Sequence, residues 1–269
     1  MINVQVVQKE RHADLMWQRF GSYEHAAADA VVHLVLPEIS RACLAMPVGF
    51  IMVRENLVPV AVQGLEPGQN LFVAEDGSWL GDYIPAAYRS HPFALGATRD
   101  GEPILCVLED SDLLVKAGGE PFFDEQGERA PCLTQVLEFM VEVVNHRKAT
   151  RRVCSVLQKH RLIEPWQFKC ETEVGIQYAE GLFRINKAAL EKLGTSEFDE
   201  LRRTGALPVI YCQLLSVQHV AKLHRMAQER KAGTPDQPLA GAEDLDLEFL
   251  NSGGTVSFGL HAPTLGTQA

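Results

Sequence analysis

Apolar and polar positions in the first half of the chain change over short distances, as is typical of β-strands. The apolar runs at 48–53 and 58–65 flank the polar residues 54–56 and predict a β-hairpin. Other strands are predicted at 71–73, 93–97 and 104–108. We therefore expect a β-rich first half built from antiparallel hairpins.

Helical spacing interrupts this half at two places. Residues 26–46 carry apolar side chains at helical intervals, and Pro37 is expected to break or kink the stretch. Residues 83–91 predict a short helix with Pro85 in its first turn. Residues 1–25 are polar and predict no regular element.

Helical periodicity dominates the second half. Residues 132–161 predict one long helix that begins near Pro131, and residues 207–230 predict another. A short helix is expected near 187–193, and a further one between the N-cap Ser196 and the stop signal Gly205; a pair of strands is predicted at 167–170 and 181–185. The expected fold class is α+β, with a helical C-terminal half that retains a few strands.

We divide the chain into three predicted parts. Residues 1–130 form a β-rich subdomain with an acidic loop, and residues 131–231 a mainly helical subdomain. Residues 232–269 form an acidic tail, which we expect to dock on its own domain; partner binding or disorder is the open alternative.

Charge is distributed unevenly. The net charge is -10, which disfavours nucleic acid as a partner over most of the surface. Nine acidic residues lie within 99–129, and residues 232–269 contain five acids and neither Lys nor Arg. The exception is a basic cluster with three open interpretations: a solvated helix face, pairing with residues 232–250, or a site for an anionic ligand. Its members are His146, Arg147, Lys148, Arg151, Arg152, Lys159, His160 and Arg161.

Several features predict a cytoplasmic protein. The N-terminal residues lack the long apolar run of a secretory signal, and no stretch has the 18 apolar residues of a membrane span. The six cysteines lie at least 16 residues apart, so no C-x-x-C motif occurs. We expect reduced thiols that pack as small apolar groups.

The sequence contains little catalytic patterning. It lacks the G-x-S-x-G, Walker and G-x-G-x-x-G motifs, so no cofactor is expected. His12-x-Asp14 has the spacing of two ligands of a facial iron site, with a distal histidine as the third. This pair is the basis for one alternative function, that of a metal-dependent oxygenase or hydrolase. We nevertheless assign no catalytic residue and no metal ligand.

The most distinctive segment is 79–93, where Trp, Tyr, Arg, His and Phe are concentrated. Flat apolar faces with polar tips suit a binding cleft, here walled by the acidic loop; a hydrogen-bonded core is the alternative. The partner would be a protein, a peptide or a small molecule. The predicted ligand-binding residues are Trp79, Tyr83, Tyr88, Arg89, His91, Glu109, Asp110 and Asp124.

Four motifs in this region resemble the bacterial SapC family. They are Gly64-Leu-x-Pro67-Gly68-x-Asn70, Gly77-x-Trp79-Leu80-x-x-Tyr83-Ile84-Pro85, Cys106-x-x-Glu109-Asp110-Ser111 and Gly119-Glu120-x-x-Phe123-Asp124-Glu125-x-Gly127. The resemblance extends over roughly residues 5–259.

The resemblance implies a modest function. The family takes its name from surface-layer operons, and its members are often encoded near cupin-like oxygenases, flavin-dependent halogenases and TonB-dependent receptors. It therefore implies a non-catalytic accessory or binding protein that serves a surface-layer, uptake or tailoring system. A surface-layer assembly component is the remaining alternative. Oligomeric state is left open.

Overall fold

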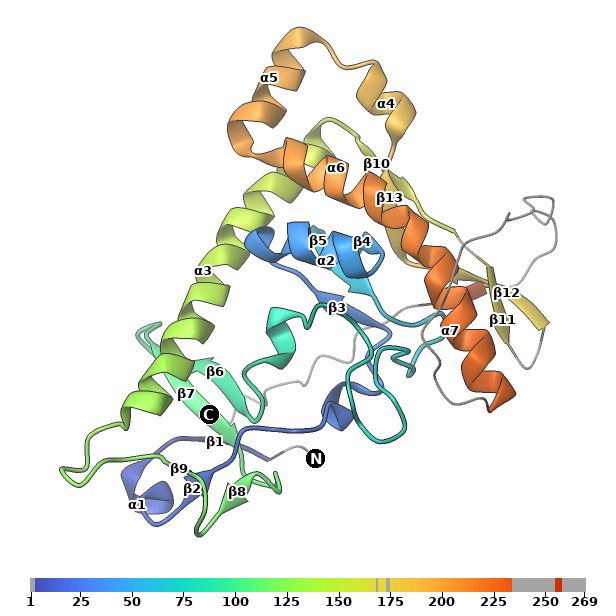
Figure 1. The fold of residues 1–269 in the computed structure, drawn as a ribbon. Helices are drawn as coiled ribbons and strands as arrows, with labels where there is room; N and C mark the ends of the chain where they lie inside the picture. Colours follow the sequence, from blue (N-terminus) through green and yellow to red (C-terminus); the bar gives the residue numbers. More distant parts are fainter. Residues whose placement is uncertain (1–2, 168, 173–174, 234–254, 258–269) are drawn as a thin grey trace.

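The computed structural model describes residues 3–167, 169–172, 175–233 and 255–257, and its centre is a five-stranded sheet (Figure 1). All neighbouring strands are antiparallel. From edge to edge the strands are β10 (Ile163–Pro165), β13 (Leu182–Ile185), β4 (Val48–Val53), β5 (Asn56–Val62) and β3 (Val31–His33). The sheet therefore combines strands from both halves of the chain.

The apolar runs of β4 and β5 explain why this sheet is central. Residues 48–51 are all buried, and because successive side chains point to opposite faces, both faces must be covered. Helix α3 (Pro131–Lys159) packs against β5, and α6 (Ala206–Ser216) packs against β4 and β13. The Ser216 hydroxyl accepts a 2.9 Å hydrogen bond from the Val48 amide, which satisfies the buried start of β4.

Three smaller sheets surround this core in the described residues. Their strands lie in the orders β1-β7-β6, β8-β2-β9 and β11-β12-β14, and β14 runs parallel to β12. The bounds are β1 (Val4–Val6), β2 (Met16–Trp17), β6 (Phe93–Ala97), β7 (Pro103–Leu108), β8 (Leu114–Val115), β9 (Glu120–Pro121), β11 (Lys169–Thr172), β12 (Gly175–Glu180) and β14 (Thr255–Ser257).

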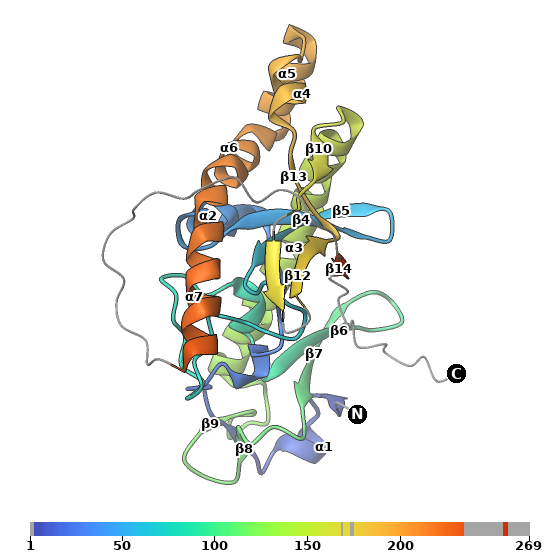
Figure 2. The ribbon, with the colours of Figure 1, turned by 90° about the vertical axis from the view of Figure 1, so that its right-hand side faces the viewer.

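Helix α3 connects two apolar cores. Near its start, Leu133 and Met140 pack with the rings of Trp17 and Phe93 in the smaller core. Near its end, Leu157 belongs to the main core around the five-stranded sheet. Figures 1 and 2 show this helix extending from the β6–β7 hairpin to α5 (Thr195–Thr204).

The remaining helices of the described residues are short, and 3₁₀ turns accompany them. They are α1 (Lys9–His12), α2 (Ile39–Ala45), α4 (Lys187–Glu191) and α7 (Val220–Ala232), with 3₁₀ turns η1 (Glu24–Ala26), η2 (Leu36–Glu38), η3 (Ala86–Tyr88) and η4 (Val217–His219). The Arg230 guanidinium in α7 donates to the carbonyls of Asn70, Leu71 and Val73. The last described helix therefore holds a loop of the first half in place.

Much of the predicted architecture is confirmed. The fold is α+β, with strands mostly in the first half and helices in the second. The hairpin at 48–62, the strands at 93–97 and 103–108, and the long helix beginning at Pro131 all occur. These elements have long or strongly patterned apolar runs, whose burial requirement leaves little choice of structure.

Several local predictions were wrong. Residues 31–33 form a strand rather than a helix, because the β-branched Val31 and Val32 complete the sheet beside β5. Residues 71–73 form only an isolated bridge to Trp79, and 83–91 contain only the turn η3. Residues 1–25, expected to be irregular, contain β1, α1 and β2.

Two predictions in the second half also need correction. Strand β13 pairs with β10 and β4, whereas the strand at 169–172 pairs with β12. The helix expected at 207–230 is interrupted at η4. There the Ser216 hydroxyl donates to the carbonyl of Gln213 at 2.7 Å, a local bond that competes with regular helical bonding.

The three-part division stays a prediction. Strands β10 and β13, assigned to the helical part, share the central sheet with β3–β5. Of the acidic tail, residues 234–254 and 258–269 lie outside the described residues, and residues 255–257 form β14. The interpretation that residues 232–250 pair with the basic cluster therefore concerns residues that lie almost entirely outside the described part.

Candidate functional site

Two cavities meet at His91, which lines both. The first, the acidic cavity, has a volume of about 600 Å³ and is lined by Glu24, His25, Asp110 and Asp112 among others. The second, the aromatic cavity, has a volume of about 510 Å³. Its main lining residues are Trp17, Phe20, Tyr23, Arg89, Phe93 and Phe139.

The acidic cavity combines two segments that lie far apart in the sequence. Turn η1 contributes Glu24, and the loop after β7 contributes Asp110 and Asp112. Neither Lys nor Arg belongs to its lining as the structure describes it. Three carboxylates around one cavity favour a cationic or hydrogen-bond-donating group.

A stacked histidine pair forms the boundary between the cavities. The ring centroids of His25 and His91 lie 3.9 Å apart with an interplanar angle of 4°. Desolvation lowers the pKa of both rings, and for His25 the neighbouring His91 lowers the pKa further. Both imidazoles are therefore neutral at pH 7, and each offers a ligand one donor or acceptor nitrogen.

The aromatic cavity contains an arginine whose charge is not matched by an acid. The Arg89 guanidinium donates from Nε and Nη2 to the Ile84 carbonyl at 3.0 and 2.8 Å, and lies over the Tyr83 ring. Within the described residues, no carboxylate lies within ion-pair distance of Arg89. Arg19, by contrast, pairs with Glu120 at 2.8 Å. The cavity therefore suits a flat apolar group that carries an anionic substituent.

Some predicted ligand residues serve the core instead. The Trp79 indole donates to the Tyr83 carbonyl at 3.0 Å and stacks on Phe72. The Tyr88 hydroxyl donates to Gln63 at 2.6 Å. Neither Trp79 nor Tyr88 lines the acidic or the aromatic cavity.

Tyr83 is also largely buried, and its hydroxyl donates to the Glu38 carboxylate at 2.8 Å. Burial, followed by the Glu38 charge, raises the pKa of Tyr83, so the phenol stays protonated at all physiological pH values. The Glu38 carboxylate also accepts from the amides of Val35 and Ala86. This carboxylate fixes η2 beside η3.

The predicted residues of the acidic loop also divide into one that lines a cavity and two that hold loops in place. Asp110 lines the acidic cavity. Glu109 pairs with Arg11 at 2.8 Å, and the Asp124 carboxylate accepts from the amides of Gln126 and Glu128. Of the eight predicted residues, Arg89, His91 and Asp110 therefore line the two cavities, whereas Glu109 and Asp124 hold loops.

A family comparison places these cavities in context. The sequence model of the SapC family matches residues 7–223, most of the chain. The chain belongs to the SapC family. No curated protein and no solved structure matches it. Among the described residues of this SapC-family chain, no helix combines the length and the apolarity that crossing a bilayer requires.

In this SapC-family fold the side chains of His12 and Asp14 lie in different surroundings. The His12 ring is fully buried against Phe122, and its Nε2 lies 3.7 Å from a Glu109 oxygen, while Asp14 is exposed. In the described part of the chain, no group of three His, Cys, Asp or Glu side chains comes together as a metal site would require.

Sequence reasoning missed several residues of the two cavities. Phe20, Tyr23 and His25 lie in the segment that carried no periodic pattern, and ring contacts rather than repeats position them: Phe20 meets both Tyr23 and His25 edge-on. Phe139 could have been identified from the sequence, because it lies beside the apolar face of the helix predicted there, which is α3.

Proposed function

We propose that this SapC-family chain is a binding protein whose aromatic cavity holds an organic anion with a flat apolar body. One observation carries the proposal: Arg89, which has no carboxylate partner among the described residues, lies at a cavity walled by five aromatic rings. Burying about 100 Å² of ligand ring surface contributes about 2.5 kcal/mol. A charge-assisted bond to Arg89 adds about 1.5–3 kcal/mol.

The acidic cavity extends the same site past His91. Because it offers carboxylates and neutral imidazoles, it accepts a donor group attached to the far end of the ligand. A ligand with an anionic group near Arg89 and an amine or hydroxyl near Asp110 would use both cavities. A peptide and a small molecule both meet this description.

The state of Cys132 favours binding over covalent catalysis. This thiol lines the aromatic cavity and contacts the Pro121 carbonyl at 3.5 Å. Burial, and then the hydrogen bond to Glu120, raise its pKa. It is therefore protonated at neutral pH and a poor nucleophile.

Family membership supports the wider role. We infer a cytoplasmic accessory protein that serves a surface-layer, uptake or tailoring system and acts by holding its ligand or partner. Immunodetection in fractionated native cells tests the location. A chain found in the envelope or medium alone would contradict it.

A pair of matched ligands tests the binding site. Saturation-transfer NMR is recorded with phenylacetate and with phenylacetamide, which differ in the charge that Arg89 would recognise. We expect phenylacetate to bind the native chain about tenfold more tightly, as one charge-assisted bond predicts. R89Q should abolish the difference, and F139A should weaken both ligands.

The control is R202Q, which removes an exposed arginine that pairs with Asp199 on α5. It should leave both ligands unchanged. Equal binding of the two ligands to the native chain, or an unchanged difference in R89Q, would overturn the proposed site.

A further inference from the structure

We propose a second, separate ligand site for a soluble phosphorylated small molecule, between α3 and the β4–β5 hairpin. A cavity of about 420 Å³ lies there, and we call it the basic cavity after Arg54, Arg147 and Arg151 in its lining. Neither the acidic nor the aromatic cavity includes any of these three residues.

Three elements bring the arginines and His33 together. Arg147 and Arg151 lie one helical turn apart on α3, so their side chains share a face. Arg54 comes from the turn between β4 and β5, and His33 from the edge strand β3. Guanidinium groups from two directions suit a phosphate, whose oxygens accept bidentate bonds on several sides.

The charges of these arginines are not matched inside the fold. Among the described residues, no carboxylate lies within ion-pair distance of Arg54, Arg147 or Arg151. The arginines at 147 and 151 repel each other, as like charges one turn apart do. An anion with two or more charges would relieve that repulsion.

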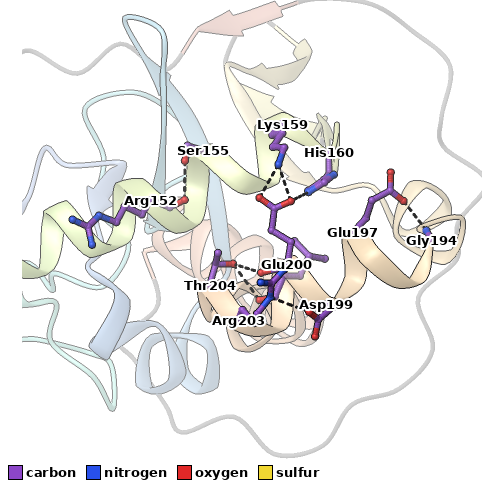
Figure 3. Close-up of polar contacts among 11 residues, drawn as sticks. Arg152, Ser155, Lys159, His160, Gly194, Glu197, Asp199, Glu200, Arg203 and Thr204 are labelled. Carbon is purple, nitrogen blue, oxygen red and sulfur yellow. Dashed lines mark hydrogen bonds and ion pairs between the residues drawn. The ribbon is translucent and has the colours of Figure 1, made fainter.

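Figure 3 shows that the same helix can match its charges where an acid is near. At the end of α3, Lys159 Nζ lies 2.7 Å and His160 Nε2 lies 2.9 Å from the two oxygens of Glu200 on α5. The basic cluster is therefore divided. One end is used by the fold, and the part around Arg147 faces a cavity.

His33 supplies an independent observation. Its Nε2 is inaccessible to solvent and finds no hydrogen-bond partner in the part of the chain that the structure describes, and the residue lines the basic cavity. An unsatisfied buried polar atom costs about 1–3 kcal/mol. Burial, and then the charge of Arg147, lower the pKa of His33, so the ring is neutral, and a rotation of the side chain would let it donate one bond to an oxyanion in the cavity.

Two other polar residues of the cavity, Thr150 and Glu38, are already engaged. The Thr150 hydroxyl donates to the His146 carbonyl and accepts from the Leu36 amide. Glu38, the one acid of the described lining, accepts from three donors, which offsets its charge. With three arginines against one carboxylate, the cavity keeps an excess of positive charge.

The backbone at Arg54 supports a role for its side chain. This residue has a φ of 57° in the turn of the hairpin, the left-handed region that favours glycine. The conformation costs about 1–2 kcal/mol for an L-residue with a Cβ. An arginine kept at such a position is consistent with a use for its guanidinium.

Calorimetric titration of the full chain with inorganic pyrophosphate at low salt tests the site. We expect R147Q/R151Q to weaken binding at least about tenfold, as the loss of two charge-assisted contacts predicts. R54G should weaken it as well, although glycine relieves the turn. Circular dichroism melting confirms that each variant is folded.

The matched control is K148Q/R152Q, which removes two charges, one turn apart, from the same helix but outside the cavity. It should stay within about threefold of the native affinity, because neither side chain lines the cavity where it could bond directly to the anion. Equal losses in the two double variants would reduce the effect to general charge attraction and overturn the site, as would the absence of any binding to the native chain.

The acids of the chain's own tail are the competing occupant. A variant with E243Q, D244N, D246N and E248Q keeps the chain length and removes four of the five acidic charges of the tail. If it binds pyrophosphate at least about tenfold more tightly than the native chain, the tail occupies the cavity and the proposal fails. Unchanged affinity supports a small-molecule ligand.

Discussion

The middle and the end of helix α3 carry similar basic residues and have different surroundings. At the end, Lys159 and His160 share the carboxylate of Glu200, so these contacts join α3 to α5. In the middle, Arg147 and Arg151 face a cavity, and no acid of the described residues is within ion-pair distance. A run of basic residues therefore says little about its role until the opposing groups are known.

The largest expected effect comes from introducing an acidic residue in the middle of α3, because the end of this helix already has an acid, Glu200, beside its basic residues. R151E places a carboxylate one turn from Arg147, where it can form an ion pair and occupy the place of the ligand. We expect pyrophosphate affinity to fall about 100-fold in calorimetry, the equivalent of about 2.7 kcal/mol. R152E, which makes the same change outside the cavity, should change affinity far less; a similar loss would remove the distinction between the two faces.

A neutral contact should matter more to stability in the middle than charge does. T150V keeps the volume of the side chain and removes the hydroxyl that accepts from the Leu36 amide at 2.8 Å. We expect a loss of about 1–2 kcal/mol in urea unfolding, with little salt dependence. T134V is the control, because the Thr134 hydroxyl contacts only the Ala130 carbonyl of its own helix. Equal losses would contradict the tertiary role of Thr150.

Substitution of His33 should change ligand affinity and the free energy of unfolding in opposite directions. H33L removes a buried nitrogen without a partner, so the free energy of unfolding should rise by about 1 kcal/mol. Pyrophosphate affinity should fall about fivefold at the same time, since one donor is lost. H33N keeps a polar group and should lack the gain in stability. A stabilised variant with native affinity would exclude His33 from the site.

The smallest expected effect lies at the end of the helix. E200Q removes the charge shared by Lys159 and His160, and should lower the urea midpoint slightly at pH 7. Lys159, and then His160, lower the pKa of Glu200 below its ordinary value of 4.5. The stabilisation is therefore complete above pH 4.5 and is lost as the pH falls through the folded-state pKa.

High salt should also reduce the effect of E200Q, in contrast with T150V. The control is E191Q, since Glu191 lies 3.9 Å from Lys187 in an exposed pair. A difference between E200Q and the native chain that persists in acid or in high salt would show that charge is not what joins α3 to α5.

The sequence could predict those parts whose burial leaves one solution. The hairpin at 48–62 and the long helix from Pro131 follow from apolar runs alone. Residues 31–33 were misassigned because the strand β5 that Val31 and Val32 pair with lies further along the chain. Local periodicity carries no information about such a partner.

The candidate sites divide in the same way. Arg89, His91 and Asp110 belong to a segment and a loop whose composition was conspicuous. His25 could not be recognised, because its role depends on a ring stacked 3.9 Å away on His91. The basic cluster could be recognised in the sequence. Whether a given basic residue pairs with Glu200 or faces a cavity depends on residues that are distant in sequence.

The hydrogen bonds that Arg230 donates to the carbonyls of Asn70, Leu71 and Val73 have a consequence for biosynthesis. The ribosome delivers the amino-terminal half first, so this loop leaves the exit tunnel long before α7 exists. Until then its carbonyls must be solvated by water or shielded by a chaperone. Nascent chains stalled before residue 230 should therefore be more sensitive to protease near residue 70 than chains stalled after α7 has emerged.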